Sequence, residues 1–151
     1  MKILSTKLML LSLFVTGSFV VNAQELTSNT DREGVHAAIE DYVLALYNVE
    51  PERIERSVDT ALTKIGYYDY NGEAYYNVPM TYQQLYDLSA RWNKKGDQIT
   101  DDSPKKIEIY EVHDRTASAQ LTAVWGIDFM HLYKRDGKWK IMNIMWQRPP
   151  K

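Results

Sequence analysis

Asp128 is the residue of this chain that could most readily do chemistry, because it is a lone carboxylate within an apolar run. The run Ile127–Tyr133 contains Asp128, and a second apolar run follows the dipeptide Asp136-Gly137. A carboxylate buried in such a segment costs several kcal/mol unless another group pairs with it. Asp128 therefore needs a partner, a ligand or a catalytic role.

Three roles are open for Asp128. It could act as a general base, because burial makes a carboxylate a better proton acceptor, with a tyrosine such as Tyr67 donating to the developing oxyanion. It could anchor the polar group of a ligand together with Asn143. It could also be structural, accepting hydrogen bonds from Asn143 or from a backbone N–H near Gly126.

Other kinds of site are not indicated. The three histidines His36, His113 and His131 are scattered and lack the spacing of metal ligands. The sequence contains no cysteine, which excludes a thiol nucleophile, a disulfide or a cysteine-based zinc site. There is no nucleophile elbow, phosphate loop or dinucleotide fingerprint either. We expect no metal and no cofactor.

The segment that positions Asp128 is a predicted β-hairpin. Asp136-Gly137 between β-rich runs favours a two-residue type I′ turn. This turn sets the register of the hairpin. The predicted pairs are Arg135 with Lys138, Leu132 with Ile141, Met130 with Asn143, and Asp128 with Met145.

This register makes both faces of the hairpin apolar. One face carries Asp128, Met130, Leu132, Trp139, Ile141, Asn143 and Met145, and the other carries Ile127, Phe129, His131, Tyr133, Met142, Ile144 and Trp146. The predicted helices can cover only one face. We therefore expect a homodimer formed through the uncovered sheet face, with His131 at this interface or at an edge.

The preceding run, Ala117–Tyr133, is too long for one straight strand. Gly126 lies near its middle and predicts a bulge or a sharp bend there. A bent sheet closed by helices would enclose a pocket. Depending on the bulge, Trp125 could face that pocket.

The rest of the fold is predicted to contain helices and short strands. Thr30 to Glu33 fits a capping box that opens a helix, and Glu50-Pro51-Glu52 begins a shorter one. Residues 62–80 indicate short strands or a hairpin around the turn 69–72, and Thr81 opens a third helix through a second capping box. The apolar stripe of the first helix comprises Val35, Ile39, Tyr42, Val43, Leu46 and Tyr47. The order of elements, with an antiparallel meander after residue 105, predicts an α+β fold.

The N-terminal residues have the pattern of a secretory signal peptide. Lys2 and Lys7 precede an apolar run that ends before small residues, which predicts residues 1–23 as the signal, cut after Ala23. We expect residues 24–30 to be a flexible lead-in and residues 31–151 to form one domain, located in the periplasm or secreted. The formal net charge of the whole chain is −2, so we expect no nucleic-acid partner and no membrane contact after cleavage.

The hairpin also resembles a known family. Trp125-x-x-Asp128-Phe129-x-x-Leu132, a Gly turn, and Trp139-Lys140-Ile141-x-Asn143 are similar to the closing hairpin of the nuclear transport factor 2-like superfamily, specifically its putative lumazine-binding group. The resemblance begins at about Asp31. The family often has a His-Pro pair after its second helix, where this chain has Asp59-Thr60. The resemblance implies a cone-shaped α+β fold, usually dimeric, with a pocket between the helices and the concave face of the sheet.

Three functions remain open from the sequence. The first is an exported protein that binds a small apolar or aromatic molecule, the second an isomerase- or dehydratase-like enzyme with Asp128 as general base, and the third a non-catalytic dimerisation scaffold. The candidate ligand-binding residues are Asp128, Asn143, Tyr67, Met130, Met145 and Trp125. An open pocket would favour a ligand, whereas a filled interior would favour the scaffold.

Overall fold

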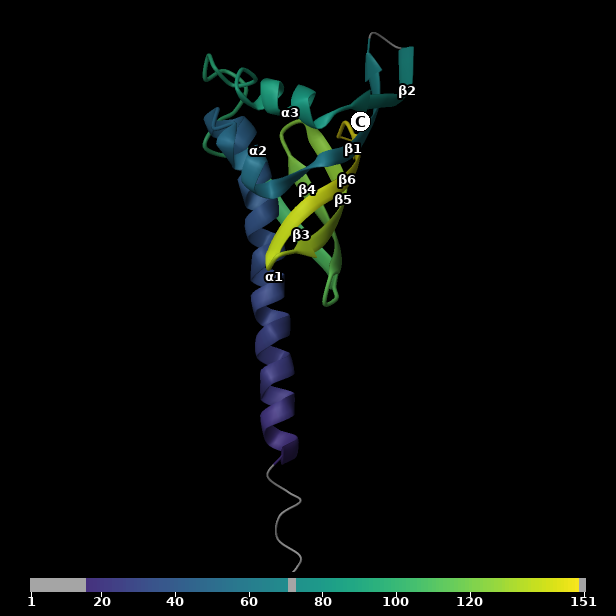
Figure 1. Cartoon of the computed structure of the whole chain (residues 1–151). Coiled ribbons are helices and arrows are strands. Elements are labelled where there is room, and N and C mark those ends of the chain that lie inside the picture. Colours follow the sequence, from purple (N-terminus) through teal and green to yellow (C-terminus); the bar gives the residue numbers. More distant parts are fainter. Residues whose placement is uncertain (1–15, 71–72, 150–151) are drawn as a thin grey trace, which may run out of the picture.

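The computed structural model describes residues 16–70 and 73–149, and it has the α+β architecture that the sequence predicts. The elements in chain order are α1 (Thr16–Asn48), α2 (Glu52–Ser57), β1 (Val58–Tyr70), β2 (Glu73–Met80), α3 (Tyr82–Ser89), β3 (Lys105–Val112), β4 (Thr116–Ala123), β5 (Gly126–Arg135) and β6 (Lys138–Gln147). Figure 1 shows the curved sheet wrapped against α1, with α2 and α3 near the end of the sheet where α1 finishes.

The strands form one sheet in the order β2-β1-β6-β5-β4-β3. The meander predicted for the C-terminal strands is confirmed, because β3, β4, β5 and β6 pair antiparallel in sequence. The β1–β2 hairpin is also antiparallel, as predicted. It joins the meander through a parallel pairing of β1 with β6, which places Lys64 opposite Ile144. The first and last strands of the chain therefore meet in the middle of the sheet.

Helix α1 covers the concave face of the sheet with the predicted apolar stripe. Its members Val35, Ile39, Tyr42, Val43, Leu46 and Tyr47 are all buried. The helix is continuous through Thr30, so it does not begin at the capping box predicted there, and it includes residues 24–30. No proline or glycine lies between Ser18 and Glu33 to interrupt it. The first fifteen residues of the predicted signal peptide lie outside the described residues.

The two shorter helices begin where the sequence places them. Pro51 is the N-cap residue of α2, and Ile54 and Val58 are buried as expected, with Val58 already opening β1. Thr81 caps α3 in a full capping box, in which its hydroxyl accepts from the Gln84 backbone N–H and the Gln84 side chain accepts from the Thr81 N–H. Of the described helices, none is both long enough and apolar enough to cross a lipid bilayer.

The turn of the β5–β6 hairpin is confirmed, but the predicted register holds only near it. Asp136 and Gly137 have φ angles of 53° and 74°, and Leu132 pairs with Ile141 as expected. His131 then pairs with Asn143, so Met142 is an extra residue in β6. The bulge increases the local twist of the strand and shifts every later pair by one residue.

The shifted register corrects two predicted pairs. Asp128 lies opposite Trp146 instead of Met145, and Met130 lies opposite Ile144 instead of Asn143. Ile144 is consequently buried, whereas 51% of Met145 is exposed on the other face of the sheet. The predicted faces are therefore right for β5 and for the start of β6, and reversed for β6 beyond the bulge.

Gly126 marks a chain reversal, and the prediction of one long bent strand is wrong. Ala123 pairs with Gly126, so β4 and β5 form a hairpin whose two-residue turn is Val124-Trp125. The φ angle of Gly126 is 138°, and a Cβ atom there would lie 2.0 Å from the backbone oxygen of Gln147. Only glycine fits this backbone and this close approach to β6.

Candidate functional site

Asp128 lies at the centre of a buried polar cluster that also contains Lys64, Tyr42 and Trp125. Its side chain is 0% exposed. One carboxylate oxygen accepts a hydrogen bond from Lys64 Nζ at 2.9 Å, and the other accepts from the indole Nε1 of Trp125 at 2.7 Å and from the Tyr42 hydroxyl at 3.4 Å. The buried carboxylate is therefore satisfied by three side chains from α1, β1 and the β4–β5 turn.

Lys64 is the cation that makes this burial possible. It is 8% exposed, and its Nζ also donates to the Tyr42 hydroxyl at 2.7 Å and lies 5.3 Å from the centre of the Tyr42 ring. A buried ion pair is tolerated when further hydrogen bonds satisfy both ions. Lys64 and Asp128 meet this condition through Tyr42, which is hydrogen-bonded to both.

Tyr42 is held as a neutral hydroxyl. Its burial, the negative charge of Asp128 and the hydrogen bond to Asp128 together raise the pKa of Tyr42 well above its ordinary value. At neutral pH the hydroxyl is therefore protonated, accepting from Lys64 while it donates to Asp128. Within the cluster, Lys64 donates to both Tyr42 and Asp128, and Tyr42 donates to Asp128.

Local backbone geometry places Trp125 over Asp128. The tight Val124-Trp125 turn and the glycine after it bring the indole, three residues from Asp128, within hydrogen-bonding distance of the carboxylate. The Tyr47 hydroxyl fixes the same turn by accepting from the Val124 backbone N–H at 3.0 Å. The rings of Tyr47 and Trp125 meet edge to face, with centroids 5.6 Å apart.

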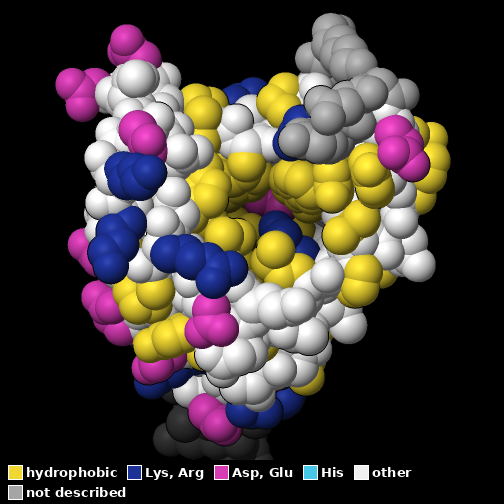
Figure 2. All heavy atoms as spheres, turned by 90° about the horizontal axis from the view of Figure 1, so that it is seen from above, with side chains coloured by type: hydrophobic (Ala, Val, Ile, Leu, Met, Phe, Trp, Pro, Cys, Tyr) yellow, Lys and Arg dark blue, Asp and Glu magenta, His cyan; other side chains and the backbone are white. Residues whose placement is uncertain are grey.

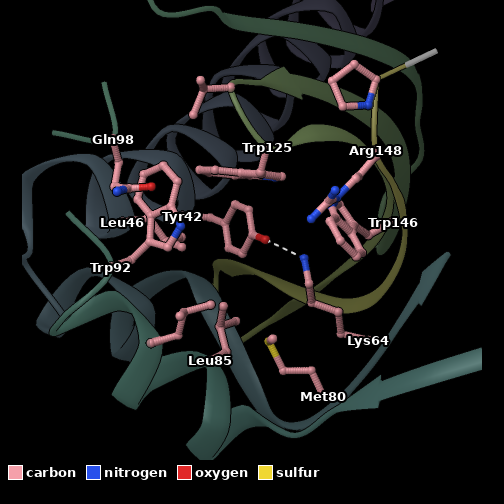
Figure 3. A pocket seen from close by; sticks show the side chains of 13 residues that line it. Tyr42, Leu46, Lys64, Met80, Leu85, Trp92, Gln98, Trp125, Trp146 and Arg148 are labelled. Carbon is pink, nitrogen blue, oxygen red and sulfur yellow. Dashed lines mark hydrogen bonds between the residues drawn. The ribbon is translucent and has the colours of Figure 1, made fainter. Parts of the chain in front are cut away.

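A cavity of about 500 Å³ lies directly beside this cluster. Figure 2 shows a hollow bordered by hydrophobic side chains, with both basic and acidic side chains visible in its depth, and Figure 3 shows the residues around it. Its walls come from α1, β1, β2, α3 and the segment that follows it, the β4–β5 turn, and the end of β6 with the residues after it. The lining residues are Tyr42, Leu46, Lys64, Met80, Leu85, Leu88, Trp92, Gln98, Val124, Trp125, Trp146, Arg148 and Pro149.

The cavity is lined mainly by apolar groups, including three tryptophans. Trp92 and Trp125 meet edge to face with centroids 5.4 Å apart. Trp146 packs tightly over Gly66, where a Cβ atom would come within 2.5 Å of the indole ring. The indole nitrogen of Trp146 is buried and has no hydrogen-bond partner among the described residues, while its ring contacts Tyr68, with centroids 5.7 Å apart, and lies 5.9 Å from Lys64 Nζ.

The predicted site residues are distributed over several places. Trp125 lines the cavity, and Asp128 lies behind the lining, covered by Trp125, Lys64 and Tyr42. Met130 is buried in the core and is not part of the lining. The sequence therefore identified one wall of the cavity and the anion behind it.

Three other predicted residues do not reach this cavity. Tyr67 lines a second depression of about 400 Å³ at the β1–β2 hairpin, together with Tyr68, Tyr75 and Tyr76. Asn143 lies on the opposite face of the sheet, where it donates to the Thr63 hydroxyl at 2.9 Å and contacts His131 at 3.0 Å. Met145 is exposed on that face. Asn143 therefore has no contact with Asp128, which corrects the expected structural partnership.

Of the thirteen lining residues, the sequence-based site set contains only Trp125, and the missed ones include Tyr42, Lys64, Trp146 and Arg148. Tyr42 was recognised only as part of the buried stripe of the first helix. The sequence contains one indication that Lys64 is buried, because Leu62, Lys64 and Gly66 alternate and so lie on one side of β1. In the structure all three are buried. A lysine on the inner side of such a strand calls for a buried acid, and Asp128 is that acid. Among the described residues, no group of acidic and histidine side chains could hold a metal ion.

Comparison with solved structures defines the fold class. The chain is similar to NTF2-like proteins of unknown function from Shewanella baltica (15% identity, 81% of this chain and 96% of that chain, TM-score 0.59) and Methylobacillus flagellatus (20% identity, 80% and 94%, TM-score 0.56). A third, from Silicibacter pomeroyi, has 18% identity, covers 82% and 95%, and gives a TM-score of 0.53. The fold is therefore NTF2-like.

A family model identifies the chain more closely. Residues 30–147 match the family described as "Putative lumazine-binding", so the chain belongs to this family. The match spans α1 from Thr30 to the end of β6 and includes Tyr42, Lys64, Trp125 and Asp128. None of the curated proteins matches the sequence.

Proposed function

We propose that this protein binds a small, flat and largely apolar molecule in the cavity beside the Lys64–Asp128 pair. The observation that carries the proposal is the cavity itself, whose volume of about 500 Å³ falls within the usual range of ligand sites. A protein that served only as a scaffold would gain stability by filling this space, because an unfilled cavity forfeits packing contacts.

The shape of the ligand follows from the walls. Trp92, Trp125 and Trp146 present broad aromatic surfaces, and Leu85 and Leu88 of α3 add an aliphatic side. Such walls favour a ring system that can lie against them. The family's name refers to lumazine, so lumazine is one compound to test, alongside neutral apolar aromatics.

The geometry favours binding over catalysis by Asp128. A general base must come within hydrogen-bonding distance of the proton that it removes. Asp128 is 0% exposed, is not part of the cavity lining, and uses both carboxylate oxygens to accept from Lys64, Trp125 and Tyr42. Its role in this proposal is to hold Lys64 and Trp125 in place.

The proposed location is outside the cytoplasm. The basic residues Lys2 and Lys7, the apolar run that follows and the small residues before Gln24 support export with cleavage after Ala23. N-terminal sequencing of the protein from its producing cells tests this part. A mature N-terminus at Gln24 is expected, and a chain that keeps Met1 would contradict export.

Ligand retention tests the binding proposal. The protein should be purified from its source cells, and native mass spectrometry should then show a bound small molecule that denaturation releases. Leu88→Trp would fill the cavity, whereas the matched variant Phe129→Trp enlarges a side chain on the outer face. We expect the wild type and Phe129→Trp to retain the compound and Leu88→Trp to lose it.

If no compound is retained, the same three proteins should be titrated with lumazine and with the neutral fluorophore N-phenyl-1-naphthylamine. Binding of either probe to the wild type and to Phe129→Trp, but not to Leu88→Trp, supports the proposal. Failure of both probes to bind the wild type, or equal binding by Leu88→Trp, overturns it.

A further inference from the structure

The charges around the cavity are of one sign. Among the described lining residues, the charged side chains are Lys64 and Arg148, and none is a carboxylate. Asp128 pairs with Lys64, but its side chain is 0% exposed, is not part of the lining, and accepts hydrogen bonds from Tyr42, Trp125 and Lys64. Of the two residues of the pair, only the cation Lys64 therefore belongs to the surface that a ligand would contact.

Lys64 also has hydrogen-bonding capacity to spare. A protonated lysine carries three N–H donors. Among the described residues, Lys64 Nζ donates to two acceptors, the Tyr42 hydroxyl at 2.7 Å and Asp128 Oδ1 at 2.9 Å. Figure 3 shows this amine at the inner end of the side chain, directed toward the middle of the lining residues. The third donor is available to an acceptor inside the cavity.

Arg148 supplies a second cation, which is more exposed than Lys64. Its guanidinium lies 5.4 Å from the centre of the Tyr68 ring and donates to the backbone oxygen of Asp69 at 3.2 Å. These contacts hold the side chain beside the end of β6, on the same cavity that Lys64 lines. A guanidinium has five donors, so these contacts leave N–H groups for a ligand.

We propose that the ligand of this cavity carries an acidic group, a carboxylate or a sulfonate-like anion, on its flat apolar body. The anion accepts from Lys64 and is neutralised further by Arg148, while the apolar body lies against Trp125, Trp146 and Leu88. Charge-assisted hydrogen bonds inside an apolar cavity are strong, because water does not compete with them. This inference rests on the proposed function, since it assigns the chemical class of the molecule that the cavity binds.

Two fluorescent probes that differ by one anionic group test the inference. N-phenyl-1-naphthylamine is neutral, and 8-anilinonaphthalene-1-sulfonate has the same aromatic body with a sulfonate. Each should be titrated into the folded protein, and Leu88→Trp shows whether the cavity is the binding site. We expect the sulfonate probe to bind the wild type about tenfold more tightly than the neutral probe, as one added charge-assisted contact would produce.

The variants separate the local donor from the overall charge. Lys64→Met alone would leave Asp128 unpaired, so the test uses Lys64→Met with Asp128→Asn, which keeps the net charge of the chain unchanged. Arg148→Gln removes the second cation, and Lys105→Met removes an exposed lysine of β3 as a matched control. We expect the double variant and Arg148→Gln to reduce the preference for the sulfonate, measured in each variant as the ratio of the two probe affinities, severalfold. Lys105→Met should change neither affinity.

The outcomes distinguish this inference from the proposed function. If both probes bind the cavity with equal affinity, or if the preference for the sulfonate survives in both cation variants, the acidic-ligand inference is wrong and the apolar binding site stands. If neither probe binds the wild type, the proposed function itself fails. Circular dichroism of every variant confirms that the fold is intact before the affinities are compared.

Discussion

Lys64 of β1 and Asp128 of β5 form a buried ion pair across β6, the strand that lies between theirs in the sheet. Their charged atoms lie 2.9 Å apart, and both residues also contact the Tyr42 hydroxyl of α1. The pair therefore connects the sheet to its covering helix at the place where the cavity begins. Its integrity should matter for stability as well as for the shape of the cavity.

Removal of Lys64 alone should destabilise the protein strongly. Lys64→Met leaves Asp128 as an uncompensated buried charge, and we expect the free energy of unfolding to fall by about 3–5 kcal/mol. Adding Asp128→Asn should restore part of this loss, because the amide is neutral and its oxygen can still accept from Trp125. Urea unfolding of Lys64→Met, of Asp128→Asn and of the double variant measures the coupling between the two residues. A double variant as unstable as the sum of the single variants would show that the two residues are not coupled.

Gly126 should not tolerate a side chain. Gly126→Ala would force a left-handed φ of 138° on alanine and place its Cβ against the Gln147 carbonyl oxygen. Backbone strain alone should cost about 1–3 kcal/mol, and the clash adds to this. Gly96→Ala is the matched control, because Gly96 also has a positive φ, of 71°, but no heavy atom within 4 Å of the added Cβ. Equal losses of thermal stability in the two variants would show that the close approach to β6 is unimportant.

Acid should weaken the contact between Asp59 and Tyr133. The Tyr133 hydroxyl and the Ala61 backbone N–H donate to the Asp59 carboxylate, and these bonds lower the pKa of Asp59 below its ordinary value. Because the folded-state pKa is the lower one, the stabilisation is complete above the unfolded-state pKa of about 3.9 and is lost as the pH falls through the folded-state value.

The variant Asp59→Asn tests this pH dependence. It should be less stable than the wild type at neutral pH by about 1–3 kcal/mol and should lose less additional stability between pH 5 and 2. Asp97→Asn, which removes an exposed loop carboxylate, is the control. The interpretation is wrong if Asp59→Asn and the wild type lose stability in parallel over the acid range.

The outer face of the sheet should mediate a homodimer. Phe129 and Met145 pair directly across β5 and β6, and they are 43% and 51% exposed. Adjacent exposed apolar residues on a sheet favour contact with a second copy. We expect light scattering to give a dimer mass for residues 24–151 and a monomer mass for Phe129→Glu with Met145→Glu. Tyr76→Glu, at a side chain 73% exposed on the β1–β2 hairpin, should stay dimeric. A monomeric wild type at all concentrations would contradict this expectation.

Much of the fold was predictable because local rules determine it. The Thr81 capping box, the Asp136-Gly137 turn and the stripe of α1 depend on neighbouring residues, and all three are confirmed. The bulge at Met142 depends on how the whole sheet curves, and no nearby residue signals it. This one residue moved Asn143 and Met145 to the outer face and brought Trp146 to the cavity.

The site was only half predictable for a related reason. Asp128 was identified because a carboxylate in an apolar strand is conspicuous, but its partner Lys64 lies 64 residues earlier. Lysines are usually exposed, so the residue type of Lys64 does not predict its burial. The pairing of β1 with β6 is parallel and joins distant parts of the chain, which periodicity alone does not predict. The requirement of Asp128 for a partner was clear from the sequence, and the structure identifies that partner.

The indole N–H signals in a nitrogen–proton correlation spectrum test the central claim most directly. The chain has four tryptophans; Trp92, Trp125 and Trp146 line the cavity, whereas Trp139 lies elsewhere, where its Nε1 donates to Asp31 at 3.2 Å. Titration with N-phenyl-1-naphthylamine should shift the signals of the three cavity tryptophans and leave that of Trp139 in place. Four unchanged signals at saturating probe, or a shift of Trp139 alone, would contradict a ligand-binding cavity beside Lys64 and Asp128.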